Sequence, residues 1–558
     1  MSSEFSGTGF RAIDHSGEWG GRLPVALIYP EEEKLAFSTL GWQSVYQDLE
    51  RDEHVFVRCF FLNKNRDGID NPNALRRLKD FGLVCFSLGF EGDFVHVLKV
   101  LLAEKIALKA RDRKHWPLVM AGGPITFLNP FPILPSLDFL FTGECNQNFL
   151  EALAVIRKQW FADQARADCL KMLTEIPGIY IPGQKAQAAR QIALSGKNIL
   201  PDPSVSAFVS ARTVFKDSFL VEINRGCRYG CRFCAAGFIY RPQRQAEMKR
   251  LQELILEAGP AKVGLVGTAL TDWPDLLPFL TWLHSRKIKF SLSSMRADGL
   301  DRHLLEFLRK TGVRTITLAV EGISAGIRRA INKHFDREKF FEVVEMVSRL
   351  RFQKLKLYFI LGLPGETVSD LAELDDFLDG LDRARKKGMG GKKKGIELVS
   401  ISASMFVPKP WTPLQWAPMD KRENYLRKAG LFRQKCSRYK GLRFNAEKPG
   451  PARIQGLLSR GDDKVHELLV LAAEKGTSWK KALQSWPGRM EDYLDHEYPL
   501  DAEFPWDCLD MGVDREYLEK EWRKYRKKIM TPPCPEAGCH QCGRCGMERY
   551  LKTIQEVD

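Results

Sequence analysis

Three cysteines stand close together in the stretch EINRGCRYGCRFCAAGF, residues 222–238. They are Cys227, Cys231 and Cys234, in a C-x3-C-x2-C spacing. Three thiols cannot all pair as disulfides, and clustered cysteines in a reducing compartment more often bind metal. Thiolates are soft ligands suited to iron–sulfur clusters, and three of them leave one iron of a [4Fe–4S] cluster without a protein ligand. A structural zinc loop is the alternative, but no fourth ligand is evident nearby.

A second cysteine group lies near the C-terminus, in PPCPEAGCHQCGRCG. Its thiols are Cys534, Cys539, Cys542 and Cys545, in a C-x4-C-x2-C-x2-C spacing, with His540 between them. Four thiolates complete the shell of a tetrahedral zinc or hold a whole [4Fe–4S] cluster. Zinc would make the tail a folding or nucleic-acid-binding module, and a second cluster would make it an electron relay or substrate anchor. We favour zinc because the group is compact and follows a basic helical segment.

Strand and helix patterns alternate around the first cysteine group. The strands are expected in SFLVEINRG, KVGLVGTAL, IKFSLSSM, VRTITLAVE, KLKLYFILGLPGE and IELVSISASMFVP. Six such units predict a partial (βα)6 or related TIM-like barrel, whose site lies at the carboxyl ends of the strands. The three cysteines directly follow the first of these strands. A basic, Gly-rich stretch at 383–395 is expected to interrupt the pattern as a loop.

The N-terminal part has its own alternation of buried strands and amphipathic helices. Strands are expected in LPVALIYP, HVFVRCFF, GLVCFSLGF, WPLVMAGGP and LDFLFTGE. This order predicts a doubly wound parallel sheet. Gly122, Gly123 and Gly143 follow strands, where such sheets place their ligand crevice.

These patterns divide the chain into five segments. The expected segments are a doubly wound domain (1–160), a linker (161–210), a barrel (211–420), a helical region (421–530) and a four-cysteine metal-binding tail (531–558).

The composition of the 558 residues indicates a soluble protein with a formal net charge of +15. No signal peptide is recognisable, and no apolar run approaches the roughly 18 residues that span a bilayer. A cytoplasmic location is therefore expected. The basic balance favours anionic partners such as nucleic acid, although a merely soluble basic surface explains it as well.

The first cysteine loop resembles the radical SAM superfamily. Phe233, the aromatic residue before the third cysteine, matches the preference of that superfamily. The resemblance implies a [4Fe–4S] cluster that binds S-adenosylmethionine (SAM) and cleaves it reductively to a 5′-deoxyadenosyl radical. It also implies an electron donor such as flavodoxin or ferredoxin.

Further matches stand at later strand ends. VGTALTD, with Gly267 and Thr268, occupies the place of the segment that meets the SAM amino group, although it departs from the usual G-G-E. Ser294 and Arg296 in SLSSMRAD are expected toward the ribose or carboxylate, and Glu321 as a polar contact to SAM. LGLPGET, with Leu363, resembles the motif whose backbone approaches adenine.

The whole chain resembles a group of radical SAM proteins with an N-terminal B12-binding-like domain. Base-off cobalamin domains carry D-x-H-x-x-G after the first strand, and its His ligates cobalt. Here that place reads YPEEEKLAFSTLG, without a His. His-ligated cobalamin is therefore not expected, whereas cobalamin without a protein ligand and a domain that lacks the cofactor both stay open.

Three functions remain compatible with these features. The first is a radical SAM enzyme that methylates or methylthiolates RNA or another anionic substrate. The second is a radical enzyme acting on a small or lipid-like metabolite, with or without cobalamin. The third is a non-catalytic iron–sulfur sensor or nucleic-acid-binding protein, which would not need the matches on the SAM side.

Overall fold

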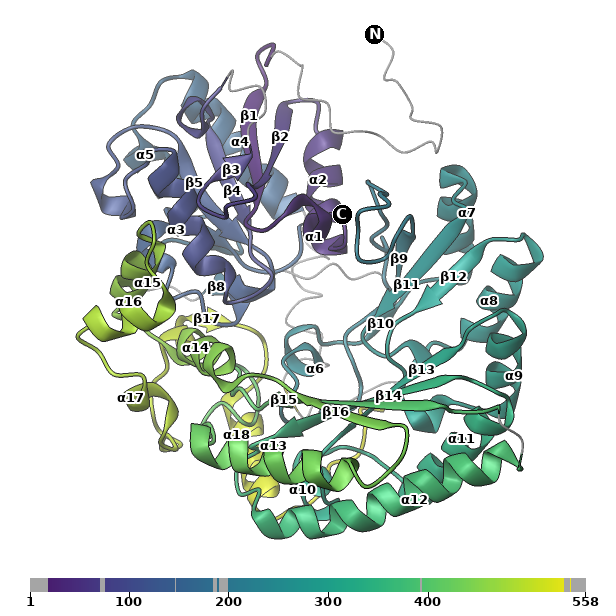
Figure 1. Cartoon of the computed structure of the whole chain (residues 1–558). Helices are drawn as coiled ribbons and strands as arrows, with labels where there is room; N and C mark the ends of the chain where they lie inside the picture. Colours follow the sequence, from purple (N-terminus) through teal and green to yellow (C-terminus); the bar gives the residue numbers. More distant parts are fainter. Residues whose placement is uncertain are drawn as a thin grey trace.

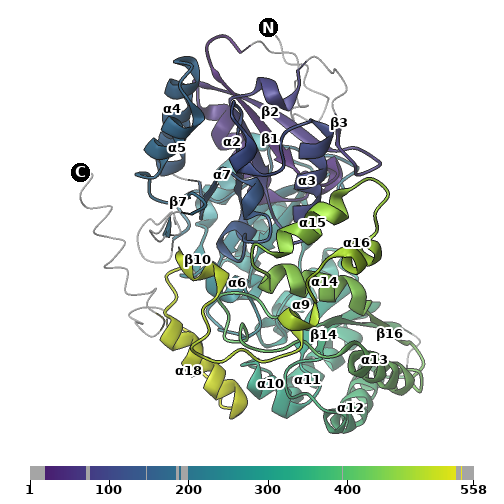
Figure 2. The ribbon, with the colours of Figure 1, turned by 90° about the vertical axis from the view of Figure 1, so that its left-hand side faces the viewer.

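The computed structural model of the chain describes residues 19–535 apart from 71–75, 146, 184–187, 190–198 and 392–393, together with residue 542. Two α/β units lie side by side in it, an N-terminal sheet with its helices and a larger arc of strands in the middle of the chain (Figure 1). Helices from the C-terminal third adjoin both units (Figure 2).

The N-terminal sheet has seven strands in the order β3-β2-β1-β4-β5-β6-β7. Their bounds are β1 Leu23–Tyr29, β2 Val55–Leu62, β3 Ile69–Asp70, β4 Leu83–Ser87, β5 Leu118–Gly122, β6 Phe139–Phe141 and β7 Ile179–Tyr180. The five central strands are parallel, and β3 and β7 are antiparallel edges. The strand order reverses between β1 and β4, which makes this the topological switch point of the sheet.

Helices cover both faces of this sheet. They are α1 Glu33–Ala36, α2 Leu40–Arg51, α3 Asp93–Ala103, α4 Gln147–Phe161 and α5 Arg166–Leu173. Alternate residues of β1 enter different cores, since Leu27 packs in the same cluster as Trp42 while Ile28 packs with Phe94. Strands buried on both faces require such continuous apolar sequences. The doubly wound fold predicted from the sequence is confirmed.

The middle of the chain forms an open arc of parallel strands. The strands are β9 Phe219–Arg225, β10 Arg244–Gln245, β11 Lys262–Gly267, β12 Lys289–Leu292, β13 Thr315–Glu321, β14 Lys354–Leu361, β15 Leu398–Met405 and β16 Leu442–Ala446. They form two sheets, ordered β10-β9-β11-β12 and β13-β14-β15-β16, which an isolated bridge between Met295 and Leu318 connects. Only β10 runs antiparallel to its neighbour. The expected partial barrel is confirmed.

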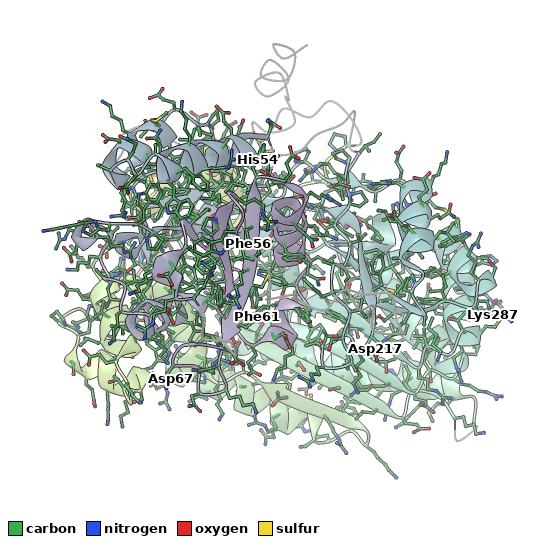
Figure 3. All side chains as sticks on the ribbon, turned by 90° about the horizontal axis from the view of Figure 1, so that it is seen from above. His54, Phe56, Phe61, Asp67, Asp217 and Lys287 are labelled. Carbon is green, nitrogen blue, oxygen red and sulfur yellow. The ribbon has the colours of Figure 1, made fainter. Side chains whose placement is uncertain are left out.

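Helices cover the outer face of the arc. They are α7 Met248–Ala258, α8 Leu276–Ser285, α9 Arg302–Lys310, α11 Arg337–Arg349, α12 Ala372–Met389 and α13 Arg422–Cys436. The short helices α6 Ala236–Ile239 and α10 Ala325–Ala330 instead pack in a core shared with the N-terminal and C-terminal elements. Outward-facing strand residues such as Val263 and Leu357 pack with helix residues such as Leu280 and Phe377 in one core. The view from above (Figure 3) places Phe56 and Phe61 of β2 in the N-terminal unit and Lys287 at the rim of the barrel.

The remaining elements lie after the barrel or are short turns. The former are α14 Pro449–Arg460, α15 Val465–Ala473, α16 Trp479–Ser485, α17 Glu491–Leu494, β17 Leu509–Asp510 and α18 Arg515–Arg526. The 3-10 helices are η1 Leu78–Asp80, η2 Ala110–Asp112, η3 Pro124–Phe127, η4 Leu134–Ser136, η5 Leu270–Asp272, η6 Ala297–Gly299, η7 Val368–Leu371 and η8 Pro505–Cys508. Strand β17 pairs with β8 (Ala188–Ala189).

One apolar core joins the two units. It contains Ile28 of β1, Leu468 of α15, and Trp416 and Leu363 from the barrel end. Helix α15 packs against α3 of the N-terminal unit. The C-terminal helices therefore act as the joint that fixes the N-terminal sheet against the barrel.

Two features differ from the sequence-based expectation. Strand β16 lies beyond residue 420, where the barrel was expected to end, and it pairs with β15. The basic stretch at 383–395 begins as helix, because α12 continues to Met389 and ends at Gly390 in a left-handed conformation. Ion pairs stabilise this basic end of the helix, with Lys386 2.7 Å from Asp382 and Lys387 2.9 Å from Glu345.

Candidate functional site

The cysteine loop begins with Gly226, and any other residue at this position would force the neighbouring backbone to move. Gly226 follows β9 with φ +84°, and a Cβ there would lie 2.4 Å from the carbonyl oxygen of Tyr240. Only glycine adopts this conformation without steric cost and allows such close approach of two backbones. The chain can therefore turn sharply from the strand end into the segment that carries Cys227.

The three thiols of this loop are brought together. Each is half-buried; the charge of Cys231 raises the pKa of both Cys227 and Cys234, and the charge of Cys227 also raises that of Cys234. The amide of Cys234 donates to the carbonyl of Cys231 at 3.0 Å, which fixes the second half of the loop. Burial raises the pKa of Cys227 to about 11 and that of Cys234 to about 12. Iron ligation would have to supply the stabilisation that holds these groups as thiolates.

The donor set fits a [4Fe–4S] cluster. It consists of three soft sulfur ligands, and each thiolate of such a cluster binds a different iron. Among the described residues, no three His, Cys, Asp or Glu side chains converge as the ligands of a single metal ion do. Arg296 and Lys333 both lower the pKa of the Cys231 thiol, so two cations stand close to this anionic ligand set.

Arg296 connects the cysteine loop to two other loops. Its guanidinium carbon lies 3.5 Å from the centroid of the Tyr229 ring. Its Nη2 donates to Asp298 Oδ2 at 2.7 Å and to the carbonyl of His334 at 3.2 Å. A small pocket adjoins it, lined also by Lys333 and Phe340. The predicted side chain is therefore at the site, beside the loop rather than free in a crevice.

Glu321 is held in a strained position at the end of β13. Its φ of +68° is uncommon for a residue with a side chain. The strand register shifts between Ala319 and Glu321, so a bulge turns the carboxylate toward the cysteine loop. Oε1 of Glu321 lies 3.7 Å from Nζ of Lys333, and burial raises the pKa of this carboxyl. Strain of this kind persists where the surrounding structure enforces it, often at functional sites.

Asn224 is a site residue that the sequence analysis missed. Its side chain is buried near the end of β9 and accepts from the amides of Thr268 (2.8 Å) and Ala269 (3.3 Å). Its Nδ2 also donates to the carbonyl of Ala269 at 2.8 Å. A Cβ at Gly267 would lie 2.6 Å from Asn224 Oδ1. Asn224 therefore shapes the strand-end turn in which Gly267 and Thr268 were expected to meet SAM.

The other predicted SAM-side residues differ in exposure. Thr268 and Ser294 are exposed at strand ends, where ligands approach. Leu363 is buried in the apolar core, so only the backbone of its motif is placed to contact a ligand, as predicted for it. Phe233 is half-buried and packs on the same core. Its ring therefore braces the loop between Cys231 and Cys234.

A segment from the C-terminal region, α18 with residues 527–534, holds the cysteine loop from outside. The Arg232 side chain is fully buried, and its Nη2 lies 2.9 Å from Glu521 Oε2 of α18. The amide of Thr531 donates to Asn332 Oδ1 at 2.8 Å, while Asn332 Nδ2 donates to the carbonyl of Gly230 at 3.2 Å. Single-sequence reasoning gives no signal for this contact, since Arg232 and Glu521 are 289 residues apart.

The C-terminal cysteine group lies partly within this segment. The amide of Cys534 donates to the carbonyl of Arg228 at 2.8 Å, inside the first cysteine loop. Cys542 is buried, and its carbonyl accepts from the amide of Asp514 at 3.1 Å. Both residues affect the pKa of Arg241. Cys539, His540 and Cys545 lie outside the described residues.

Several residues at the carboxyl edge of the N-terminal sheet contact other parts of the protein. A Cβ at Gly123 would lie 2.5 Å from the carbonyl oxygen of Leu88, so this glycine serves close packing of two strand ends. Glu91 is buried and forms an ion pair with Lys409 of the barrel end. Asn129 Nδ2 donates to the carbonyls of Ser459 (3.1 Å) and Gly461 (2.7 Å). These groups are bound to the C-terminal half of the chain.

Comparison with known proteins agrees with this geometry. The family model of the radical SAM superfamily matches residues 221–391, and a model described as radical SAM proteins, N-terminal, matches residues 41–182. The chain belongs to the radical SAM superfamily. Its membership makes it a radical SAM enzyme and implies a [4Fe–4S] cluster and SAM.

Known proteins match the chain over different lengths. The uncharacterised protein MJ0966 of Methanocaldococcus jannaschii is 27% identical over 481 residues, which cover 84% of this chain and 96% of that protein. The ribosomal protein uS12 methylthiotransferase RimO of Streptomyces griseus is 26% identical over 181 residues, which cover 29% of this chain and 36% of RimO. A tRNA-2-methylthio-N(6)-dimethylallyladenosine synthase of Clostridium botulinum is 27% identical over 174 residues, which cover 27% of this chain and 37% of that synthase.

Among solved structures, the radical SAM methyltransferase TsrM of Kitasatospora setae, with cobalamin and a [4Fe–4S] cluster bound, has a similar fold. The TM-score is 0.51 at 15% identity, over 71% of this chain and 77% of TsrM. The combination of an N-terminal sheet and a radical SAM barrel is thus shared. In the described part of this radical SAM protein, no helix is long and apolar enough to cross a bilayer.

Proposed function

We propose that this radical SAM enzyme transfers a methyl or methylthio group to RNA or another anionic substrate. The observation that carries the proposal is the placement of Arg296, Lys333 and Glu321 around three clustered thiols. The partial similarity to two methylthiotransferases and the net charge of +15 support the reaction type and the substrate class. The reductant is a low-potential donor such as flavodoxin or ferredoxin.

The residues divide into ligands and SAM contacts. Cys227, Cys231 and Cys234 would hold a [4Fe–4S] cluster, which supplies the electron that cleaves SAM. Arg296 and Lys333 provide positive charge for the SAM carboxylate, and Glu321 accepts hydrogen bonds from its amino group. Charge-assisted hydrogen bonds of this kind are stronger than neutral ones and fix orientation.

Additional residues orient the bound SAM. Asn224 keeps the turn at Gly267 and Thr268 in place beside it, and Ser294 lies exposed at the next strand end. Thr268 and Ser294 are therefore proposed as direct contacts, and Asn224 as a positioning residue. The backbone at Leu363 faces the adenine in this proposal.

The described residues at the edge of the N-terminal sheet offer no evident histidine ligand for the cobalt of cobalamin. His96 lies beside the first strand-end loop; its Nδ1 is 3.1 Å from the carbonyl oxygen of Pro30, and its Nε2 is 3.4 Å from Arg66 Nη2. Both ring nitrogens are thus engaged. The polar groups of the loops after β4 and β5 are bound to Lys409 and α14, as described above. We therefore derive no step through cobalamin.

The test is anaerobic reconstitution with iron and sulfide, followed by reduction. The cluster should give an electron paramagnetic resonance signal that changes when SAM is added, and the protein should release 5′-deoxyadenosine slowly without substrate. The triple variant with Cys227, Cys231 and Cys234 replaced by alanine should lose both properties. Cys436→Ala, which removes a buried thiol of α13, is the matched control and should retain them. A signal that SAM leaves unchanged would refute an open iron.

A further inference from the structure

The inner face of the sheet β13–β16 carries a group of polar side chains on β14, β15 and β16, whereas the outer face is apolar. Along β15 and along β14 up to Phe359, every second residue is buried among the helices, and the residues between them are partly or largely exposed. The latter point to the inside of the arc, because side chains of a strand alternate between the two faces. On β14 they are Lys354, Lys356 and Tyr358.

Parallel register aligns these residues with polar side chains on the neighbouring strands. Lys356 lies opposite Ser400, and Ser400 opposite Arg443. One step further along, Tyr358 lies opposite Ser402, and Ser402 opposite Asn445. Neighbouring strands are about 4.8 Å apart, so the Cα atoms of Lys356 and Arg443 are roughly 10 Å apart. We call these seven residues the inner face: Lys354, Lys356, Tyr358, Ser400, Ser402, Arg443 and Asn445.

The cations of the inner face have no protein partners in the described part of the chain. No ion pair or side-chain hydrogen bond involves Lys354, Lys356 or Arg443 there, whereas Lys428 and Lys435 of α13, on the other side of the sheet, are paired. The closest carboxylate along the neighbouring strand is Glu321, and it faces Lys333. Three uncompensated positive charges therefore stand on one sheet surface, and an anionic ligand complements them.

Tyr358 is unusual among the aromatic residues of the barrel. Its side chain is 42% exposed on an inward-facing sheet position. Aromatic rings between cations on a sheet are the arrangement with which proteins bind single-stranded nucleic acid, because bases stack on the rings while cations follow the phosphates. The hydroxyls of Ser400 and Ser402 add donors and acceptors that suit ribose hydroxyls.

We propose that the inner face binds a single-stranded segment of an RNA substrate. The proposal rests on the proposed function and names its substrate class. Lys354, Lys356 and Arg443 contact phosphates, and a base stacks on Tyr358. Register places Phe359, the next residue, opposite Glu321. The base stacked on Tyr358 therefore lies one residue along the strand from Glu321, the carboxylate assigned to SAM. The phosphates lie toward the amino-terminal ends of the strands, where Lys354 and Lys356 are.

Direct binding of RNA tests the proposal. The reconstituted holoenzyme is titrated, without oxygen, into a fluorescein-labelled single-stranded RNA of about 12 nucleotides and mixed sequence, and anisotropy is followed. Replacing Lys354, Lys356 and Arg443 together by glutamine should weaken binding at least about tenfold at low salt. The slope of log K against log salt should become less steep by about 2, since each phosphate contact on a single strand contributes about 0.7.

Tyr358→Ala should weaken binding about five- to 150-fold, from the ~1–3 kcal/mol that stacking of a base contributes. Tyr358→Phe should retain it. A triple glutamine variant at Lys249, Lys310 and Arg427, exposed on outer helices, removes the same charge and should bind as the parent does. Circular dichroism and iron content establish that each variant is folded.

Several results would overturn the proposal. Binding that the inner-face variants leave unchanged, or that the outer-helix variant weakens equally, would show general attraction to a basic surface. Competition by ATP as effective as that by unlabelled RNA would indicate a small phosphorylated substrate instead. SAM cleavage by the parent without any RNA binding would refute this inference and leave the proposed function intact. RNA binding without SAM cleavage would refute the proposed function and leave this inference intact.

Discussion

The guanidinium of Arg296 stacks on the ring of Tyr229, 3.5 Å from its centroid. Tyr229 stands between the first and second cysteines of the loop in the sequence. The same side chain bonds to Asp298 on its own loop and to the carbonyl of His334. Arg296 therefore joins three loops with one planar group, and a lysine at this position makes neither the stack nor the paired hydrogen bonds.

We predict that Arg296→Lys weakens SAM binding more than it lowers cluster content. Loss of a hydrogen bond to a charged group costs ~1.5–3 kcal/mol, so the dissociation constant of SAM should rise about ten- to 150-fold. Calorimetric titration of the reconstituted protein before reduction, when SAM is bound but not cleaved, measures it, with iron analysis alongside. Arg302→Lys, whose exposed guanidinium pairs with Glu306 on the same helix, is the control. Equal loss of iron and SAM binding would mark Arg296 as structural.

The buried pair of Arg232 and Glu521 gives a prediction about the stability of the loop. Glu521→Gln leaves the buried guanidinium without its counter-charge and should cost ~3–5 kcal/mol. Denaturation by urea under anaerobic conditions should show this loss, and the variant should release iron to a chelator faster than the parent. Replacing both members of the buried ion pair by apolar residues of similar volume, Arg232→Met with Glu521→Leu, should recover most of the free energy of unfolding. If Glu521→Gln unfolds as the parent does, α18 does not hold the loop.

The C-terminal cysteines should bind metal independently of the barrel cluster. Four thiolates close the shell of one ion, and so short a segment has little core of its own to stabilise it. Metal analysis of the variant without Cys227, Cys231 and Cys234 should find about one zinc per chain and no iron. About four irons would identify a second cluster instead. Neither metal would show that the tail is not a metal site.

His96 predicts a loss of stability at acidic pH. Burial, followed by the charge of Arg66, lowers the pKa of this imidazole to about 4, below its unfolded value of 6.5. Because the folded state disfavours the proton, the contribution is complete above pH 6.5 and is lost as the pH falls toward 4. The free energy of unfolding should drop by ~1–3 kcal/mol over this window. His96→Gln, which does not titrate, should show a smaller drop, and an identical drop would contradict the assignment.

Much of the fold could be predicted because its signals are local. The strands that carry the site, such as β9 and β13, are apolar runs between helical patterns, and all six predicted barrel strands form. Strand β16 was missed because exposed positions such as Arg443 and Asn445 break its apolar pattern at the sheet edge. The helical end of α12 was missed because its cations pair with Asp382 and with Glu345 of another helix, which a composition rule does not detect.

Site residues could be predicted where their type and spacing in the sequence indicate a ligand set. They could not be predicted where their role depends on contacts between distant parts of the chain. The three cysteines are recognisable from their spacing alone. Asn224 and Lys333 have no such signature, since an isolated Asn or Lys in a sequence is usually solvated. Their roles follow from the turn at Gly267 and from the bulge before Glu321, which only three-dimensional structure brings next to the thiols.

The contacts of Asn129 with Ser459 and of Ser136 with His466 have a consequence for biosynthesis. Each joins residues 330 positions apart in the chain. At the usual elongation rate of about 5–20 residues per second, roughly 15–70 s pass between the synthesis of the first partner and that of the second. During this interval one apolar flank of the N-terminal sheet has left the ribosome without the helices that cover it. The nascent chain is therefore a natural client for chaperones, and truncation before α14 should yield aggregates rather than a shorter soluble protein.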